Sequence, residues 1–278
     1  ATKKRQKERQ MISLIFSYSF MVRAMIAGGL ISLCSALLGV SLVLKRFSMI
    51  GDGLSHVAFG TMAIALAFNW APLAVSIPVC VAAAFLLLRV SGSSGIKGDA
   101  AIALISSSAL AIGILVTSLT SGLNTDVSAY MFGSILAISK TDTYISIILA
   151  LIVCSLYAVF YKRIFLVTFD ETFAKASGIK VEAFNGLIAV LTALTIVIGM
   201  RLMGAMMISS LLVFPALSAM RVFKSFWKVV ICAAGLSLLC FFTGICASFF
   251  LSTPAGASIV VCNLTAFMLC ALAGYIKR

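Results

Sequence analysis

Residues 229–250, VVICAAGLSLLCFFTGICASFF, decide the fold class of this chain, because no charged side chain interrupts them. The run is long enough for one helix to cross a bilayer, which takes about 20 apolar residues. It is continuous rather than alternating between apolar and polar residues, and this pattern favours a helix over a strand of a membrane barrel. Comparable runs recur along the sequence, so we expect an all-α polytopic membrane protein with about eight or nine transmembrane helices. The expected spans lie near residues 21–44, 53–69, 72–89, 100–120, 143–161, 184–200, 203–220, 229–250 and 255–276.

Composition agrees with this fold class. Hydrophobic residues make up 62% of the chain and charged residues 10%, whereas a soluble domain carries about 25% charged residues. No polar stretch is long enough for a soluble domain, so residues 21–278 are expected to form one transmembrane domain. The net charge of +13 does not indicate a nucleic-acid partner, because the basic residues lie in short loops beside the apolar runs, as in the cytoplasmic loops of membrane proteins.

The distribution of basic residues predicts an orientation in the bilayer. If residues 162–182 are cytoplasmic, most Lys and Arg residues beyond the N-terminal tail lie on the cytoplasmic side, while Lys140 and Arg201 lie in outer loops. Nine spans would then leave the basic tail outside, against that distribution. We therefore interpret residues 1–20 as a basic tail followed by an interfacial helix, with Met11 as a candidate native start, rather than as a cleaved signal peptide.

The chain has one histidine, His56, four residues after Asp52 in the segment GDGLSH at residues 51–56. In a helix this spacing places both side chains on one face, about 6 Å apart. An oxygen ligand and an imidazole together suit zinc, manganese or ferrous iron. Two ligands are fewer than the roughly four of a structural zinc site, which favours passage of an ion over storage. The same pair from a second copy on a two-fold axis would complete a set of four.

Two structural interpretations of this pair stay open. His56 could be a hydrogen-bonded histidine of the protein core, and Asp52 could cap the N-terminus of the second span. We favour a functional interpretation, because ionisable side chains inside a membrane are costly and usually line the route of an ion or a substrate.

The sulfur-containing residues are interpreted as structural. The 8 cysteines fall in apolar runs without a Cys-x-x-Cys pair, and we expect small buried hydrophobic residues rather than disulfides or thiolate metal ligands. Met200, Met203, Met206 and Met207 are expected to pack in the core. A gate role for Met203 stays open.

Five stretches resemble the permease subunits of metal-importing ABC transporters of the ABC-3 type. They are LKRFSMIGDGLSH at residues 44–56, DVSAYMFGSIL at 126–136, FDETFAKASG at 169–178, MGAMMI at 203–208 followed by Pro215 and Ala216, and TPAGASIV at 253–260. They occur in the order typical of the family and cover most of the chain from residue 21 onward. One departure is Phe59-Gly60-Thr61, where many relatives have Leu-Pro-Gly, so the path of the helix beyond His56 stays open.

The resemblance implies a multi-pass permease of the bacterial cell membrane, with a type II ABC importer-like fold and no enzyme activity of its own. Its partners would be a second permease copy, cytoplasmic ATPase subunits and an extracytoplasmic metal-binding protein. It would import zinc, manganese or iron, with Asp52 and His56 lining the path and no permanently bound cofactor. Residues 92–98, GSSGIKG, lack the spacing of a phosphate-binding loop, so the residues themselves also assign ATP hydrolysis to another subunit.

The resemblance also implies a coupling helix that docks on the ATPase from the loop at residues 162–182. Its residues are Phe169, Asp170, Glu171, Ala174 and Gly178. Gly178 is well placed to end a short helix, and the alternative is an ordinary solvated loop helix. Asp126 and Asp142 are expected to be solvated acids of the outer loop, with contact to the binding protein as the alternative.

Two other classes of function stay open. A secondary transporter would use Asp52 and His56 to relay protons, although such proteins often carry several intramembrane carboxylates and only Asp52 lies within reach of an expected span. A membrane metalloenzyme would need further ligands and a general base, and the chain has no second histidine. The residues do not distinguish zinc from manganese or iron. His56 must be neutral to bind any of them, so uptake is expected to weaken at acid pH.

Overall fold

The structure, a computed structural model, describes residues 19–93, 98–120, 133 and 138–276, and these form helices joined by short links without a strand among them. Nine helices of this described part are long and apolar enough to cross a membrane, which confirms the all-α polytopic fold class. The helices are α2 (Ser19–Leu44), α3 (Ile50–Ala67), α4 (Pro72–Ser93), α5 (Gly98–Leu119), α7 (Lys140–Val159), α8 (Tyr161–Phe169), α9 (Glu171–Ala176), α10 (Val181–Met203), α11 (Ala205–Val222), α12 (Phe226–Leu251) and α13 (Ala255–Ile276).

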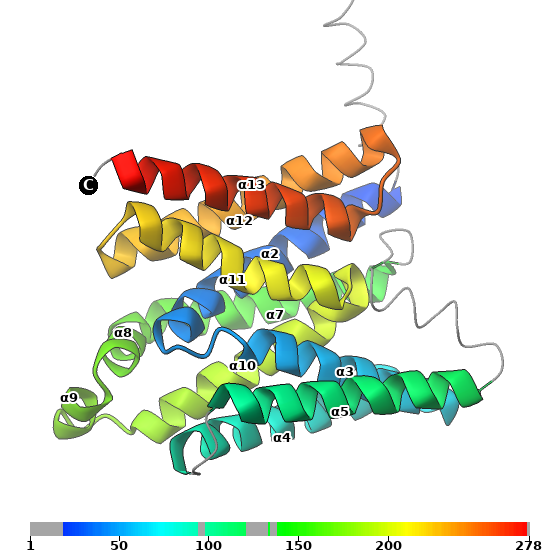
Figure 1. Ribbon diagram of the computed structural model, residues 1–278, viewed down its shortest axis with the longest axis horizontal. Coiled ribbons are helices and arrows are strands. Elements are labelled where there is room, and N and C mark those ends of the chain that lie inside the picture. The colour runs from blue at the N-terminus through cyan, green and yellow to red at the C-terminus, as the bar shows by residue number, and fades with distance from the viewer. Residues whose placement is uncertain (1–18, 94–97, 121–132, 134–137, 277–278) are drawn as a thin grey trace, which may run out of the picture.

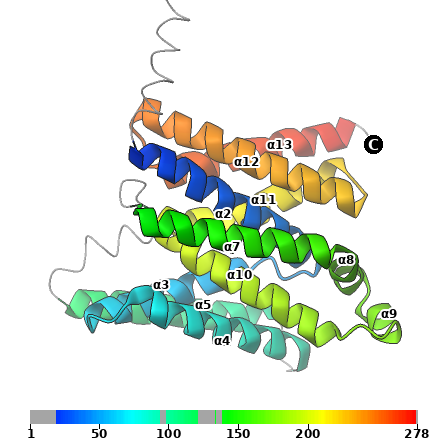
Figure 2. The same ribbon diagram turned by 180° about the vertical axis from the view of Figure 1, so that it is seen from behind.

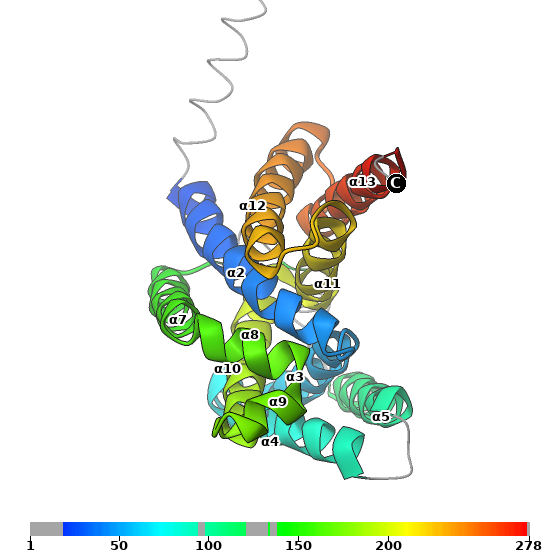
Figure 3. The ribbon, with the colours of Figure 1, turned by 90° about the vertical axis from the view of Figure 1, so that its left-hand side faces the viewer.

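The spanning helices form two faces around a central helix. Helices α13, α11, α3 and α5 lie on the face that Figure 1 presents, and α12, α7, α10 and α4 lie on the opposite face in Figure 2. Helix α2 packs against α7, α10, α11 and α12, and the end-on view in Figure 3 shows it between them. Helices α2, α3 and α10 are the most buried spans, whereas α4, α5 and α13 leave most of their surface open.

Glycines let α2 approach its neighbours closely. A Cβ atom on Gly39 would lie 1.9 Å from the carbonyl oxygen of Leu212 in α11, and one on Gly28 would lie 2.2 Å from the ring of Phe241 in α12. In a membrane, helices associate through such close packing, because lipid provides no hydrophobic driving force between them. The central position of α2 therefore depends on its small residues.

Helix α3 continues without a break through Phe59, Gly60 and Thr61, the positions that depart from the family pattern. A Cβ atom on Gly60 would lie 2.5 Å from the carbonyl oxygen of Ala109, so glycine permits close contact between α3 and α5. On the α4 side, the Thr61 hydroxyl donates a hydrogen bond to the Ser76 hydroxyl at 3.0 Å. The departure therefore leaves α3 continuous and packed against both neighbours.

One end of the bundle collects α8, α9, the link between α11 and α12, and the end of α13 (Figure 1). The basic residues of these segments, among them Lys162, Lys175 and Lys224, therefore lie at the same end, as the predicted orientation requires. The basic tail and most of the interfacial helix predicted at residues 11–20 lie outside the described residues. Helix α2 begins at Ser19.

The cysteines and methionines follow the predicted pattern with one exception. All eight cysteines are free, lie within helices and are buried or partly buried. Met200, Met203 and Met207 are buried, as expected for core packing. Met206 is instead 55% exposed, on the first turn of α11.

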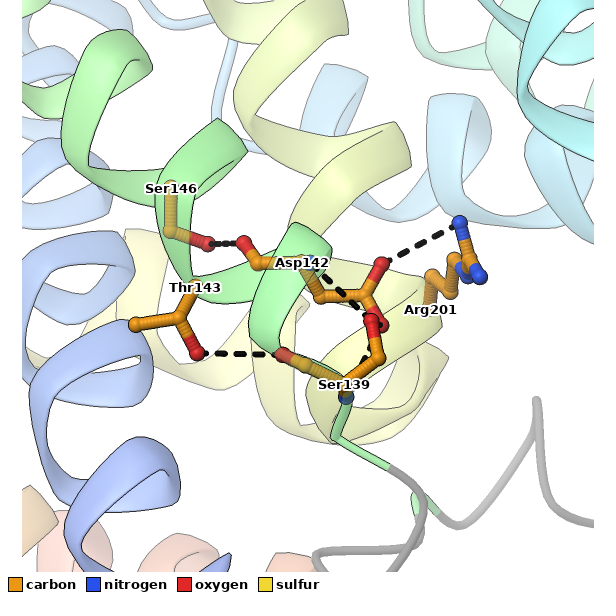
Figure 4. Close-up of polar contacts among 5 residues, drawn as sticks. All are labelled: Ser139, Asp142, Thr143, Ser146 and Arg201. Atoms are coloured by element: carbon orange, nitrogen blue, oxygen red, sulfur yellow. Dashed lines mark hydrogen bonds and ion pairs between the residues drawn. The ribbon is translucent and has the colours of Figure 1, made fainter.

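Asp142 corrects the sequence analysis, which assigned it to a solvated outer loop. It is buried in the first turn of α7. Its carboxylate accepts hydrogen bonds from the backbone N–H and the hydroxyl of Ser139, at 3.1 and 2.7 Å. In return, the backbone N–H of Asp142 donates to the Ser139 hydroxyl, and the two residues form a capping box. The other carboxylate oxygen lies 3.2 Å from Nη1 of Arg201 near the end of α10 (Figure 4). Asp142 thus caps α7 and ties it to α10. Asp126 lies outside the described residues.

We expect Asp142→Asn to lower the stability of the protein by about 1–3 kcal/mol, because the amide removes the charge that faces Arg201 while it can still accept the capping hydrogen bonds. Asp142→Ala also removes the cap and should lower stability by about 1 kcal/mol more. Thermal unfolding in detergent measures both changes. An unchanged unfolding temperature for Asp142→Asn would show that the ion pair does not stabilise the bundle.

The contact between α2 and α11 predicts a second stability effect. Gly39→Ala places a methyl group against the Leu212 carbonyl and should lower stability by at least about 1–3 kcal/mol, the usual range for overpacking. Gly235→Ala in α12 is the matched control, since no atom outside the adjacent backbone of α12 lies within 4 Å of its Cβ position. The control should unfold at or slightly above the wild-type temperature, and equal effects of the two substitutions would contradict the backbone contact.

Candidate functional site

Asp52 and His56 lie one turn apart in α3, as their spacing predicts. The distance from His56 Nε2 to Asp52 Oδ2 is 3.6 Å, and the side chains of Asp52 and His56 are 46% and 23% exposed. Helix α3 is itself one of the helices apolar enough to span a membrane. A carboxylate and an imidazole therefore meet on a partly open face of a span, where both can reach an incoming cation.

The hydroxyls of two serines lie close to Asp52. The Ser209 hydroxyl of α11 can donate to Asp52 Oδ1 at 3.3 Å or to the carbonyl of Ala205 in its own helix at 3.0 Å, and Ser55 donates to the backbone carbonyl of Asp52 at 2.7 Å. The two serine hydroxyls lie 3.5 Å apart. Oδ1 is thus held toward α11, while Oδ2 lies on the side of His56.

Ser209 is a site residue that the sequence analysis missed. A serine within the apolar run at residues 203–220 is typical of helix packing in membranes, so it carried no functional signal. A weak signal does exist in the periodicity of the helix. Ser209 follows Met206 by three residues, which places both on one side of α11, and the structure leaves this side partly open.

The geometry fits neither structural interpretation of the pair. Met49 is the N-cap of α3 and no side chain caps this N-terminus, so Asp52 is not a capping residue, although its charge in the first turn is favourable to the helix dipole. His56 is not a hydrogen-bonded core histidine, because its Nδ1 is buried without a hydrogen-bond partner among the described residues. Neither helix capping nor core hydrogen bonding therefore accounts for the pair.

The donor atoms of this pair are of the kinds that divalent transition metals prefer. A carboxylate oxygen and an imidazole nitrogen suit zinc, manganese and ferrous iron. Within the described ranges no group of three or more His, Cys, Asp and Glu side chains could hold a metal ion, so one chain offers only this pair. Conduction requires binding weak enough to release the ion, and a pair of donors on a partly open face is compatible with release.

The predicted coupling helix is shorter at its start than the sequence indicated. Phe169 is the last residue of α8, and Asp170 is the N-cap of α9. The Asp170 carboxylate accepts a hydrogen bond from the backbone N–H of Phe173 at 2.9 Å, which satisfies a free amide of the first turn. The chain therefore turns between Phe169 and Glu171 instead of continuing as one helix.

The end of α9 is as predicted. Gly178 has a φ of 78° and follows the C-cap residue, a position where glycine adopts the left-handed conformation at no steric cost. The backbone N–H groups of Gly178 and Ile179 donate to the carbonyls of Lys175 and Ala174, both at 3.0 Å. These two hydrogen bonds form a Schellman motif.

Helix α9 has one packed side and one open side. Ala174 is fully buried against Val167 of α8 and Val181 of α10. Phe169 and Phe173 are 56% and 57% exposed, at the end of the bundle where α8 and α9 lie. Exposed aromatic rings beside a helix that is packed on the bundle form a surface that a partner protein can cover.

Three curated membrane proteins are similar to this chain over most of its length. It is 29% identical over 252 residues to the high-affinity zinc uptake system membrane protein ZnuB of Haemophilus influenzae, which covers 91% of this chain and 97% of that protein. It is 28% identical over 274 residues to the manganese import system permease protein ScaB of Streptococcus gordonii, with 97% and 98% covered. It is 28% identical over 247 residues to the manganese transport system membrane protein MntC of Listeria monocytogenes, with 89% and 88% covered.

Two solved structures share the fold. PsaBC from Streptococcus pneumoniae in complex with Fab matches with a TM-score of 0.84 and 27% identity, covering 94% of each chain. An inward-facing metal-chelate type ABC transporter matches with a TM-score of 0.75 and 17% identity over 91% of this chain and 86% of that chain, which shows the fold alone. The apolar spans and these relatives make this chain a multi-pass permease of the bacterial cell membrane and not an enzyme. The model of the ABC 3 transport family matches residues 17–274, and the chain belongs to that family.

Proposed function

We propose that this chain is the permease subunit of an ATP-driven importer of a divalent transition metal, and that the ion passes Asp52 and His56. The observation that carries the proposal is the meeting of the Asp52 carboxylate, the His56 imidazole and the Ser209 hydroxyl on one open face of a membrane-spanning bundle. Ionisable groups in such a position usually serve the passage of an ion. The names of the relatives, a zinc uptake system and a manganese import system, support a metal ion as the cargo.

The cargo in this proposal is zinc, manganese or iron. The donor pair suits all three ions, and relatives named for zinc and for manganese are similar to this chain to nearly the same degree. We therefore assign the choice among these metals to the binding protein that delivers the ion rather than to Asp52 and His56.

Three partners belong to the proposal. Cytoplasmic ATPase subunits cover α9 and the exposed ring of Phe173, and their closure on ATP moves α9 so that the path opens alternately to each side. An extracytoplasmic metal-binding protein delivers the ion to the outer mouth. A second permease copy places its own Asp52 and His56 on a shared two-fold axis, which raises the ligand number from two to four.

A proton-coupled secondary transporter is the alternative, and a second carboxylate within a span would favour it. Asp142, which the sequence analysis assigned to an outer loop, is such a carboxylate, because it lies in the span Lys140–Val159. It is bound to Arg201 and Ser139, and a carboxylate with these partners suits a structural role better than a proton relay. Uptake that persists without any ATPase subunit would favour the alternative.

Substitutions at the site test the proposal in the assembled transporter. Asp52→Asn and His56→Ala should each lower metal uptake by about a hundredfold or more, because the first replaces an anionic ligand with a neutral amide and the second removes the imidazole. Ser209→Ala should lower uptake by about tenfold, because it releases the carboxylate that Ser209 orients. Uptake of Zn²⁺ and Mn²⁺ into liposomes that contain the permease with its ATPase subunits, with ATP inside and the metal-binding protein outside, measures these losses at equal protein content.

Ser210→Ala is the matched control for Ser209→Ala. The Ser210 hydroxyl is buried and donates to the carbonyl of Met207 in its own helix, so its loss should leave uptake near the wild-type level. Near-normal uptake by Asp52→Asn or His56→Ala would remove the site assignment. Equal losses for Ser209→Ala and Ser210→Ala would remove the orienting role of Ser209.

A further inference from the structure

Lys45 lies in the turn between α2 and α3, and its side chain is only 7% exposed. Its Nζ lies 2.8 Å from Oε1 of Glu171 in α9 and also donates a hydrogen bond to the side-chain carbonyl of Asn185 in α10. The Asn185 amide donates to the same Glu171 oxygen at 3.1 Å, which closes a ring of three contacts. We name Lys45, Glu171 and Asn185 the Lys45 clasp.

The turn between α2 and α3 is held by backbone hydrogen bonds on both sides. Arg46 has a φ of 63°, and the N–H groups of Arg46 and Phe47 donate to the carbonyls of Val43 and Leu42 at 3.0 and 2.8 Å, which ends α2 in a Schellman motif. The N–H of Ile50, the first residue of α3, donates to the carbonyl of Phe47 at 3.1 Å. The clasp is therefore joined to the helix that carries the candidate metal site through a turn with little freedom to absorb a displacement.

Helix α9 projects at the end of the bundle (Figure 1) and packs on α8 and α10. These contacts do not include α3. The ion pair between Lys45 and Glu171 adds a contact between α9 and the turn that precedes α3. This ion pair therefore connects α9, through the turn, to α3, the helix that carries Asp52.

Burial and hydrogen bonding shift the pKa values of both charged groups in the clasp, Lys45 and Glu171. Burial lowers the pKa of Lys45, while its hydrogen bond to Glu171 opposes that change. For Glu171, burial acts to raise the pKa, but hydrogen bonds from Lys45 and Asn185 and the positive charges of Lys45 and Lys175 outweigh it, so the pKa lies below its usual range. The carboxylate form of Glu171 is therefore stabilised by the clasp.

Water has little room on the Lys45 side of the clasp, whereas the Glu171 side chain is 48% exposed. The cavity beside Lys45, which Phe47 and Asn185 also line, measures about 10 Å³, at the lower limit for a single water molecule. A lysine separated from Glu171 here would remain as a buried charge without its counter-ion, which is strongly unfavourable. Movement of α9 is therefore opposed unless the turn before α3 follows it.

We propose that Lys45 and Asn185 are positioning residues that transmit a displacement of α9 to α3 and so couple the ATPase to the face that carries Asp52. The inference rests on the proposed function, which supplies the ATPase at α9. It adds a specific route for the coupling, with Glu171 as the point on α9 where the displacement enters.

The assembled transporter in liposomes tests this inference, with Zn²⁺ and Mn²⁺ as separate probes and with imported ions and hydrolysed ATP measured in the same preparation. Lys45→Met should lower the number of ions imported per ATP by about tenfold, because the apolar stem still packs but no longer binds Glu171. Asn185→Leu should act in the same direction from α10. In both variants the ATPase subunits should still co-purify with the permease and hydrolyse ATP. Lys224→Met, which removes an exposed lysine from the link between α11 and α12, should keep the wild-type ratio.

A double variant separates one shared contact from two independent effects. Lys45→Met combined with Glu171→Gln should lower the ratio no further than Lys45→Met alone, because both substitutions break the same pair. A wild-type ratio in Lys45→Met would overturn the inference. Loss of the ATPase subunits from both Lys45→Met and Asn185→Leu would also overturn it, since failed docking would then explain the defect. A wild-type transporter that imports none of Zn²⁺, Mn²⁺ and Fe²⁺ would instead overturn the proposed function.

Discussion

A carboxylate inside an apolar bundle needs polar partners, and the contact between Asp52 and Ser209 meets this need only because α3 and α11 lie close together. Glycine permits that approach. A Cβ atom on Gly51 would lie 3.3 Å from the side chain of Leu212 in α11, and one on Gly53 would lie 2.7 Å from a side chain of α5. The two small residues beside Asp52 thus let neighbouring helices enclose the acid while its second oxygen stays open to a cation.

Helix α10 makes polar contacts at both of its ends, and the chain continues from it into α11, which carries Ser209. Asn185 belongs to the Lys45 clasp near its start, and Arg201 binds Asp142 of α7 near its end. Gly204, with a φ of 87°, follows α10 directly and lets α11 begin with the next residue. Ser209 lies in the second turn of α11, so the hydroxyl that orients Asp52 is covalently continuous with a helix that is tied at both ends. The site therefore connects to α9 through the turn before α3 and also through α10 and α11.

The spans were predictable because crossing a bilayer depends on uninterrupted apolar length, which a sequence displays directly. The ends of the helices were harder to predict than the spans. Helix α7 begins before the predicted residue 143, because a capping box extends it through charged positions that hydropathy excludes. Asp52 and His56 were predictable because their spacing within one helix determines their proximity. Ser209 and Lys45 were not, because their contacts join segments far apart in the chain and depend on how helices pack, for which no local pattern exists.

The central claim is that the transported ion binds at Asp52 and His56. X-ray absorption at the zinc edge, on the assembled transporter loaded with less than one Zn²⁺ per permease chain, tests it most directly. The account predicts oxygen and nitrogen neighbours at about 2.0–2.1 Å from zinc, with imidazole scattering that disappears in His56→Ala. Sulfur neighbours at about 2.3 Å, or imidazole scattering that persists in His56→Ala, would contradict it.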